Sequence, residues 1–273
     1  MDRPTTYLVS SLPHHIILRL PCMKLHAAVR MGRAHLTYCE DFLLAEGIGR
    51  KSLLCAVLDG CSMGKDAHFS SALFGKLLRM IAHEITLESK KDQGLTWDES
   101  QPETLAREVL RRLFKAVRKT RKQLHLEYEE LLTTVLLWVH HYETQRSFVI
   151  SLGDGVVSCD GQVHIIDQNN RPDYLAYHLK KDFKTWYAQQ QHTFHFEAPK
   201  DLCIATDGVE TFRPHAKEFV NEENLTYNAL PYLMVEATHP EAENMLDQKL
   251  EVLRKKGLAP VDDLALIRAQ FDQ

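Results

Sequence analysis

Apolar and polar positions alternate in the first part of the chain in a way that predicts strands. Residues 24–31 alternate loosely, residues 41–48 form a second strand-like segment, and residues 52–58 (SLLCAVL) are almost wholly apolar. Alternation is typical of a half-buried strand, and a continuous apolar run is typical of a strand covered on both faces. We therefore expect the chain to begin with strands, one of them central in a sheet.

Two long amphipathic helices are predicted next. Over residues 67–88, apolar side chains recur at every fourth position, which places them on one face of a helix. Residues 102–129 carry a second stripe of this kind, and Pro102 suits a first helical turn. The polar residues 90–101 are expected to form the loop between the two helices.

Strands are predicted to dominate the second half of the chain. Short apolar segments, separated by turn residues, cover residues 131–140, 146–152, 156–159, 162–166, 192–196, 202–206 and 264–269. The first four are expected to form an antiparallel meander, with Asp160-Gly161 as the turn of its last hairpin. Residues 241–256 predict one more helix, and residues 168–191 show no clear period.

The order of these elements favours one fold class. Helices are not regularly interleaved with strands, which disfavours a doubly wound parallel sheet. A sheet sandwich with helices packed on its outside, an α+β architecture, fits the order better. The chain shows no internal repeat and no linker-like segment, so we expect a single domain over residues 1–273.

Composition excludes several classes of protein. The 273 residues include 33 Lys and Arg and 37 Asp and Glu, a formal net charge of −4, and 44% of them are apolar. These values are typical of soluble globular proteins and exclude a disordered chain. A mildly acidic chain has no electrostatic reason to prefer nucleic acid. One predicted helix carries a basic face, which we interpret as a solvated surface balanced by nearby glutamates rather than a nucleic-acid site; its members are Arg107, Arg111, Arg112, Lys115, Arg118, Lys119, Arg121 and Lys122.

The cysteines and the apolar segments bear on location. The six cysteines form no C-x-x-C pair; they are Cys22, Cys39, Cys55, Cys61, Cys159 and Cys203. We predict free thiols, because a chain of this length can build its own core. Residues 1–21 do not have the pattern of a secretory signal, and no apolar run approaches the length of a membrane span. A cytoplasmic protein without membrane contact is expected.

Acidic residues are placed at the ends of the predicted strands. Three apolar strands run into an Asp-Gly pair, namely Asp59-Gly60, Asp154-Gly155 and Asp207-Gly208, and two acidic pairs precede strands, namely Glu40-Asp41 and Asp262-Asp263. Asp-Gly is also a strong hairpin signal, but no returning strand follows Asp59 or Asp207. Converging carboxylates repel one another unless a cation joins them. Carboxylates with neighbouring carbonyls are the ligands of Mg²⁺ or Mn²⁺, so a metal site is predicted.

These motifs, in this order, resemble the metal-dependent protein serine/threonine phosphatases of type 2C, and most closely their compact, divergent bacterial branch. The motifs that carry the resemblance are TYCEDF, AVLDGCSMGKDAHFSSALF, LLTTVLLWV, SLGDG, CIATDG and Asp262-Asp263 before LALI. The resemblance covers about residues 24–270. It implies two antiparallel β-sheets packed as a sandwich with helices on the outer faces, a four-layer αββα fold, with a variable flap at about residues 168–191.

The resemblance also implies a role for each acidic residue. Asp59 is expected to bridge two Mn²⁺ or Mg²⁺ ions, with the Gly60 carbonyl beside it. The other implied ligands are Asp207 and Asp262 on one ion, Glu40 on the second through water, and Asp154 on a weaker third ion. Asp41 is expected to orient water, so Asp41 and Asp59 form the implied catalytic pair.

The implied reaction is hydrolysis of phosphoserine and phosphothreonine in proteins by a metal-activated water, without a covalent intermediate. The implied partners are a phosphoprotein substrate and a serine/threonine kinase of the same pathway, and we expect a monomer. The phosphate-binding arginine of the family is replaced by Leu36, and the candidates for its role are Arg33, Arg30 and His35. The alternative is a pseudophosphatase that acts as a protein-binding module.

Overall fold

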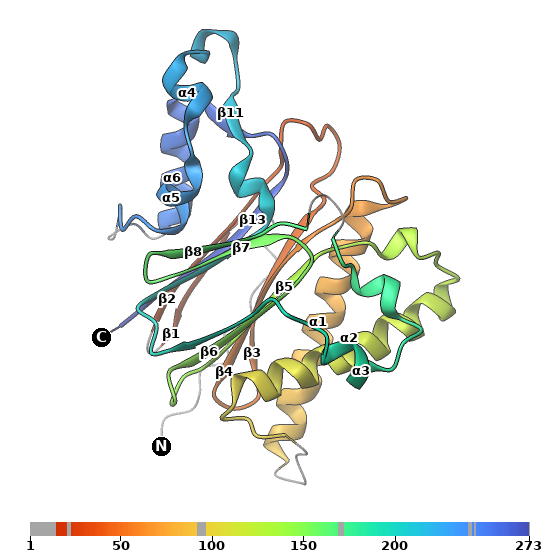
Figure 1. The fold of residues 1–273 in the computed structure, drawn as a ribbon. Coiled ribbons are helices and arrows are strands. Elements are labelled where there is room, and N and C mark those ends of the chain that lie inside the picture. Colours follow the sequence, from red (N-terminus) through yellow and green to blue (C-terminus); the bar gives the residue numbers. More distant parts are fainter. Residues whose placement is uncertain are drawn as a thin grey trace.

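Two antiparallel sheets packed face to face form the centre of the fold (Figure 1). The computed structural model describes residues 15–20, 23–91, 97–168, 172–239, 242 and 244–272. The five-stranded sheet has the order β3 (Asp41–Ile48), β4 (Ser52–Asp59), β5 (Val135–His141), β6 (Arg146–Leu152), β9 (Thr193–Glu197). The six-stranded sheet has the order β1 (His15–Leu20), β2 (Met23–Arg30), β13 (Leu264–Phe271), β10 (Asp201–Ala205), β7 (Gly155–Cys159), β8 (Gln162–Ile166).

Helices cover the outer faces of both sheets, which confirms the predicted fold class (Figure 1). On the five-stranded sheet lie α1 (Ala67–Lys90) and α2 (Pro102–Leu124), and the short α3 (Phe183–Tyr187) packs against α2. The six-stranded sheet is covered by α5 (Ala229–Met234) and α6 (Met245–Lys255). The small elements α4 (Glu222–Thr226), β11 (Phe212–Pro214) and β12 (Leu258–Pro260) lie beside them.

Strand β4 shows why its sequence is almost wholly apolar. Its side chains alternate between two cores. Leu54 and Ala56 lie in the core between the five-stranded sheet and its helices, and Cys55 and Val57 lie in the core between the two sheets. Successive side chains of a strand point to opposite faces, so a strand between two apolar layers has no polar side. The prediction of a central, doubly covered strand is confirmed.

The predicted meander over residues 131–166 is wrong, because β6 and β7 belong to different sheets. The chain crosses between the sheets at Gly153, whose φ of +95° is unfavourable for other residues. Asp154 therefore lies at the junction of the two sheets. The hairpin at Asp160-Gly161 is confirmed, since both residues take positive φ between β7 and β8.

Several boundaries differ from the sequence prediction. The second helix ends at Leu124 instead of residue 129, because His125 adopts a left-handed conformation with φ of 55° and its amide donates to the Arg121 carbonyl. The strand expected from residue 131 starts at Val135. Helix α6 starts at Met245, and the predicted start of this helix, Glu241, lies outside the described residues.

The basic face of α2 is largely engaged within the protein. Glu108 accepts hydrogen bonds from Arg111 and Arg112, and Arg112 also binds Glu88. The guanidinium of Arg121 lies 3.9 Å from the centre of the Tyr128 ring. These contacts support the interpretation of a structural, solvated face.

Two other sequence expectations can be compared with the structure. The described cysteines are free thiols, namely Cys39, Cys55, Cys61, Cys159 and Cys203, and Cys22 lies outside the described residues. Within the described part of the chain, no helix has both the length and the apolar character needed to cross a membrane.

Two buried cations hold the C-terminal end of α5. Arg268 is fully buried, pairs with Asp201 at 2.7 Å, and donates to the carbonyl of Leu233 at 3.0 Å. Lys249 is also fully buried, and its Nζ donates to the Tyr232 carbonyl at 2.5 Å. These donors satisfy carbonyls that a helix end leaves without partners.

We expect the free energy of unfolding to depend on pH through Lys249. Burial and the nearby charge of Arg268 lower its pKa to about 8 in the folded protein, whereas the pKa of a lysine in an unfolded chain is about 10.4. Between these values the unfolded chain binds more protons, so this residue makes the free energy of unfolding rise with pH. We expect wild type to gain on the order of 2 kcal/mol over Lys249→Met between about pH 8 and pH 10 in urea titrations. A constant difference over this range would contradict the assignment.

Candidate active site

Asp41 and Asp59 face each other where two neighbouring strands meet the end of the sheet. Asp41 is the first residue of β3, Asp59 is the last residue of β4, and the two are partners in the strand register. Burial raises the pKa of Asp59 well above its ordinary value, and the charges of Asp41, Asp207 and Asp262 add to the effect. A buried carboxylate among like charges is costly without a cation.

Thr206 holds one oxygen of Asp41. Its hydroxyl donates to Asp41 Oδ2 at 2.7 Å, while the buried Oδ1 has no hydrogen-bond partner among the described residues. Burial raises the pKa of Asp41 well above its ordinary value, although the bond from Thr206 acts in the opposite direction. The structure thus fixes the Asp41 side chain and leaves one of its oxygens unused.

The threonine pair before β5 fixes the backbone of Asp59. The amide of Thr134 and the hydroxyl of Thr133 each donate to the Asp59 carbonyl at 2.8 Å. In return, the Asp59 amide donates to the Thr134 hydroxyl at 3.0 Å. These three bonds explain the Thr-Thr motif physically, because they set the direction in which the Asp59 side chain leaves the strand.

The glycines after Asp59 and Asp207 are required by close backbone contacts. A Cβ at Gly60 would lie 2.1 Å from the carbonyl oxygen of Ala67, and one at Gly208 would lie 1.8 Å from the carbonyl oxygen of Asp263. Such distances leave no room for a side chain. The Asp-Gly pairs therefore bring neighbouring loops close to the carboxylates and are not hairpin turns.

Asp207 and Asp154 extend the acidic group. Asp207 begins a 3-10 helix, Asp207–Glu210, which Thr206 separates from the end of β10. Burial, together with the charges of Asp262 and Asp154, raises the pKa of Asp207 to about 6. Burial also raises the pKa of Asp154, whose Oδ1 accepts the amide of Gln168 at 2.7 Å.

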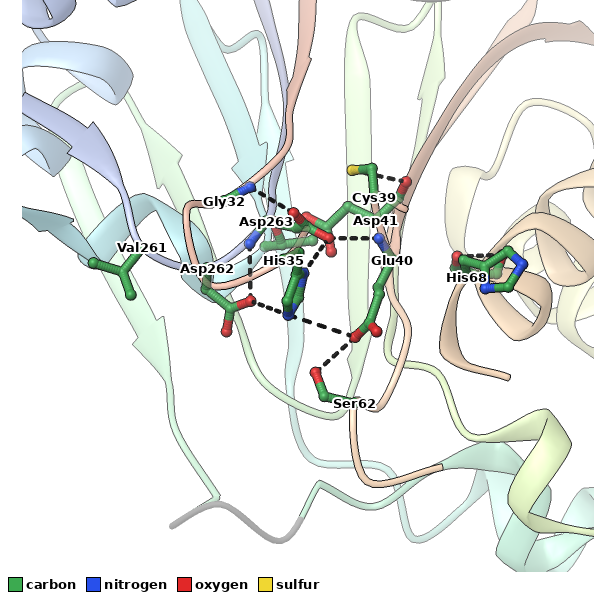
Figure 2. A network of polar contacts seen from close by, with 12 residues as sticks. Gly32, His35, Cys39, Glu40, Asp41, Ser62, His68, Val261, Asp262 and Asp263 are labelled. Carbon is green, nitrogen blue, oxygen red and sulfur yellow. Dashed lines mark hydrogen bonds and ion pairs between the residues drawn. The ribbon is translucent and has the colours of Figure 1, made fainter. Parts of the chain in front are cut away.

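Asp263 joins the loop of residues 31–40 to the start of β13. Its Oδ1 accepts the amide of Gly32 at 2.6 Å, and its Oδ2 accepts the amide of Glu40 at 2.5 Å and His35 Nδ1 at 2.6 Å (Figure 2). Sequence reasoning gave no role to Asp263. The signal that could have found it is its position between Asp262 and a buried strand, where an acidic side chain needs donors.

His35 lies among the acidic residues. Figure 2 shows its ring between Asp262 and Glu40, with Nε2 at 3.6 Å from Asp262 Oδ1 and 3.8 Å from Glu40 Oε2. Burial alone would lower the pKa of His35, but the hydrogen bond to Asp263 and the surrounding carboxylate charges outweigh it and raise this pKa. Glu40 is held in turn by the Ser62 hydroxyl, which donates to its Oε2 at 2.6 Å.

The structure brings most of the predicted site residues to one end of the sandwich. These are Glu40, Asp41, Asp59, Gly60, Asp154, Asp207, Asp262 and His35. Arg33 differs, because it is exposed. Its backbone amide donates to the carbonyl of Pro260, at the end of β12, at 3.1 Å. In the described part of the chain, no three His, Cys, Asp or Glu side chains already stand in the arrangement of metal ligands.

Three aromatic residues of the expected flap, residues 168–191, divide into two groups. Tyr174 and Trp186 are buried in the core between the five-stranded sheet and its helices, where they pack with apolar side chains. Tyr177 is 57% exposed. Arg171 lies outside the described residues.

Comparisons with known proteins define the class. The sequence profile for protein phosphatase 2C matches residues 31–254. This chain belongs to the protein phosphatase 2C family, as the sequence motifs predicted. A search of curated proteins found no match.

Solved structures share the fold. RsbX, crystallised with magnesium, has a TM-score of 0.54 at 15% identity, over 94% of this chain and 100% of that chain. The phosphatase domain of SpoIIE from Bacillus subtilis, with a fragment of its regulatory domain, has a TM-score of 0.53 at 15% identity, over 92% and 63% of the two chains. The catalytic domain of PstP, crystallised with two manganese ions, has a TM-score of 0.53 at 14% identity, over 92% and 99%.

We expect substitution of Asp263 to cause a large loss of stability. Asp263→Ala removes the acceptor of three hydrogen bonds and leaves two backbone amides unpaired, so we expect the free energy of unfolding to fall by about 3 kcal/mol. The matched control is the neighbouring Asp262→Ala, whose side chain is 47% exposed and which should cost about 1 kcal/mol or less. Urea titration measures both, and equal losses would contradict the anchoring role of Asp263.

Proposed function

We propose that this chain is a metal-dependent protein phosphatase that hydrolyses phosphoserine and phosphothreonine esters. The observation that carries the proposal is the group of buried or half-buried carboxylates with raised pKa values, Asp41, Asp59 and Asp207, at one end of a protein phosphatase 2C sandwich. Such a group needs positive charge to remain ionised. A phosphoryl group bound beside these carboxylates would also carry negative charge, and positive charge would be needed to neutralise it.

The residues present fit divalent ions. The side chains proposed as ligands are carboxylates, and Mg²⁺ and Mn²⁺ prefer oxygen ligands. We propose that two ions are held by Asp59, the Gly60 carbonyl, Asp207, Asp262 and Glu40, with a weaker third near Asp154. The structures of RsbX with magnesium and PstP with two manganese ions support this choice. When bound, the ions would neutralise phosphoryl charge and lower the pKa of water.

The chain's own residues would position the reactants. The unpartnered oxygen of Asp41 can accept a hydrogen bond from the attacking water, because Thr206 already holds the other oxygen. His35 can donate from Nε2 to a phosphoryl oxygen, since its Nδ1 is fixed by Asp263. We propose His35 for the role of the missing phosphate-binding arginine, with Arg33 as the second candidate.

One observation favours the alternative of a catalytically weak, protein-binding pseudophosphatase. Leu36, at the position of that arginine, is 90% exposed and offers no charge to a phosphate. The retained carboxylates weigh against this alternative, because buried acids without a cation destabilise a protein. Measurements of ion binding and of turnover separate the two.

The extent of the domain, the oligomeric state, the location and the partner are part of the same proposal. We propose a single phosphatase domain over residues 1–273 with a flap at about 168–191, working as a monomer in the cytoplasm. Its partner would be a phosphoprotein, phosphorylated by a serine/threonine kinase of the same pathway.

Hydrolysis should depend on both the metal and the carboxylates. We expect wild type to hydrolyse an aryl phosphate and a phosphothreonine peptide with Mn²⁺ and not with a chelator. Asp59→Asn and Asp207→Asn should each lower kcat/KM by about 100-fold or more, because each would remove charge from an ion site. The control is Asp160→Asn, since Asp160 also stands before a glycine but forms a hairpin turn. Equal turnover by all four proteins would refute the site assignment.

Ion binding can be measured without activity. A ligand that binds only the folded state stabilises it, by about 2.7 kcal/mol at a concentration 100-fold above its Kd. We expect Mn²⁺ to raise the Tm of wild type and of Asp160→Asn by several degrees, and that of Asp59→Asn and Asp207→Asn by much less. A stabilised wild type without turnover would establish the pseudophosphatase. No stabilisation at all would exclude a metal site.

A further inference from the structure

The most exposed large apolar side chains of the described residues lie on the loops that border the site. Met63 is 95% exposed, Leu36 is 90% exposed and Tyr38 is 59% exposed. Single apolar side chains are common on protein surfaces, but apolar side chains that gather on one surface mark an interaction site. We call Leu36, Tyr38 and Met63 the rim surface.

Two members of the rim surface are tied to the site by their neighbours in the chain. Leu36 follows His35, whose ring binds Asp263. Met63 follows Ser62, whose hydroxyl binds Glu40, so the two loops meet at Glu40 (Figure 2).

Tyr38 is held by the start of α1. Its ring stacks on His68, with 4.3 Å between the ring centres and 15° between their planes. An aromatic side chain fixed in this way can contact a partner at a low cost in conformational entropy.

The loops that carry the rim surface are held by backbone hydrogen bonds. The amide of Ala34 donates to the carbonyl of Val261 at 2.8 Å, and the amide of Lys65 donates to the carbonyl of Glu129 at 3.2 Å. The apolar side chains are therefore presented on anchored loops. A partner that binds them does not need to order these segments first.

We propose that the rim surface docks the phosphoprotein substrate through apolar residues that flank its phosphorylated serine or threonine. This inference rests on the proposed function and names the substrate class. A partner that covers the rim surface also reaches the carboxylates, because His35 and Ser62 link the two. The exposed side chains of Leu36 and Met63 offer neither charge nor hydrogen-bonding groups, so apolar flanks complement the rim surface best.

The test uses two matched phosphothreonine peptides, one flanked by leucine and phenylalanine and one by serine and asparagine, together with an aryl phosphate. We expect wild type with Mn²⁺ to prefer the apolar peptide by about 10-fold in kcat/KM, mainly through KM. In the double variant Leu36→Ser/Met63→Ser the ratio of the two peptides should fall to about one. The matched control is Val220→Ser/Leu225→Ser, which changes apolar residues that are 54% and 53% exposed elsewhere and should keep the preference.

The outcomes separate the two proposals. If wild type hydrolyses the aryl phosphate but treats both peptides alike, or the double variant keeps the preference, the rim surface does not select the substrate. If wild type is a dimer in sedimentation and the double variant is a monomer, the rim surface binds a second copy, and the substrate proposal is overturned. If wild type hydrolyses none of the three probes, the proposed function fails, and this inference fails with it.

Discussion

Repulsion among carboxylates at one end of the sandwich is the constraint on which the rest of the site depends. Burial withdraws water from Asp41, Asp59 and Asp207, and their charges disfavour one another, as the raised pKa values show. Left to themselves, such groups would take up protons or separate. Among the residues that the structure describes, no arginine or lysine forms an ion pair with these three carboxylates, and hydrogen bonds hold Asp41 and Asp59 in place.

Several kinds of contact do this holding. Thr133 and Thr134 lock the backbone of Asp59, and Thr206 locks one oxygen of Asp41. Glycines at 60 and 208 let the neighbouring loops approach more closely than any side chain would permit. The result is a preorganised group of oxygens, and such a group favours a divalent cation.

The sequence predicted the sandwich and most residues of the candidate site because both leave strong local signals. Buried strands are apolar, so an acidic residue at the end of one, such as Asp59, is conspicuous. The roles of Asp263 and Thr206 were missed because they depend on contacts with residues more than 150 positions away. The meander was wrong for a similar reason, since a hairpin and a crossing at Gly153 look alike until the second sheet is placed.

The chain passes from one sheet to the other at Gly153, and the alignment of these two sheets affects the site. Asp41 and Asp59 lie at the end of one sheet and Asp207 at the end of the other, so the distances between them measure how the sheets are aligned. Close-packed side chains such as Trp138 and Ile267 between the sheets act as the spacer that sets this alignment. A sliding movement of one sheet over the other would pull the acidic group apart, although no residue of the site had changed. The packing in the interior of the sandwich therefore determines the distances between the carboxylates of the site.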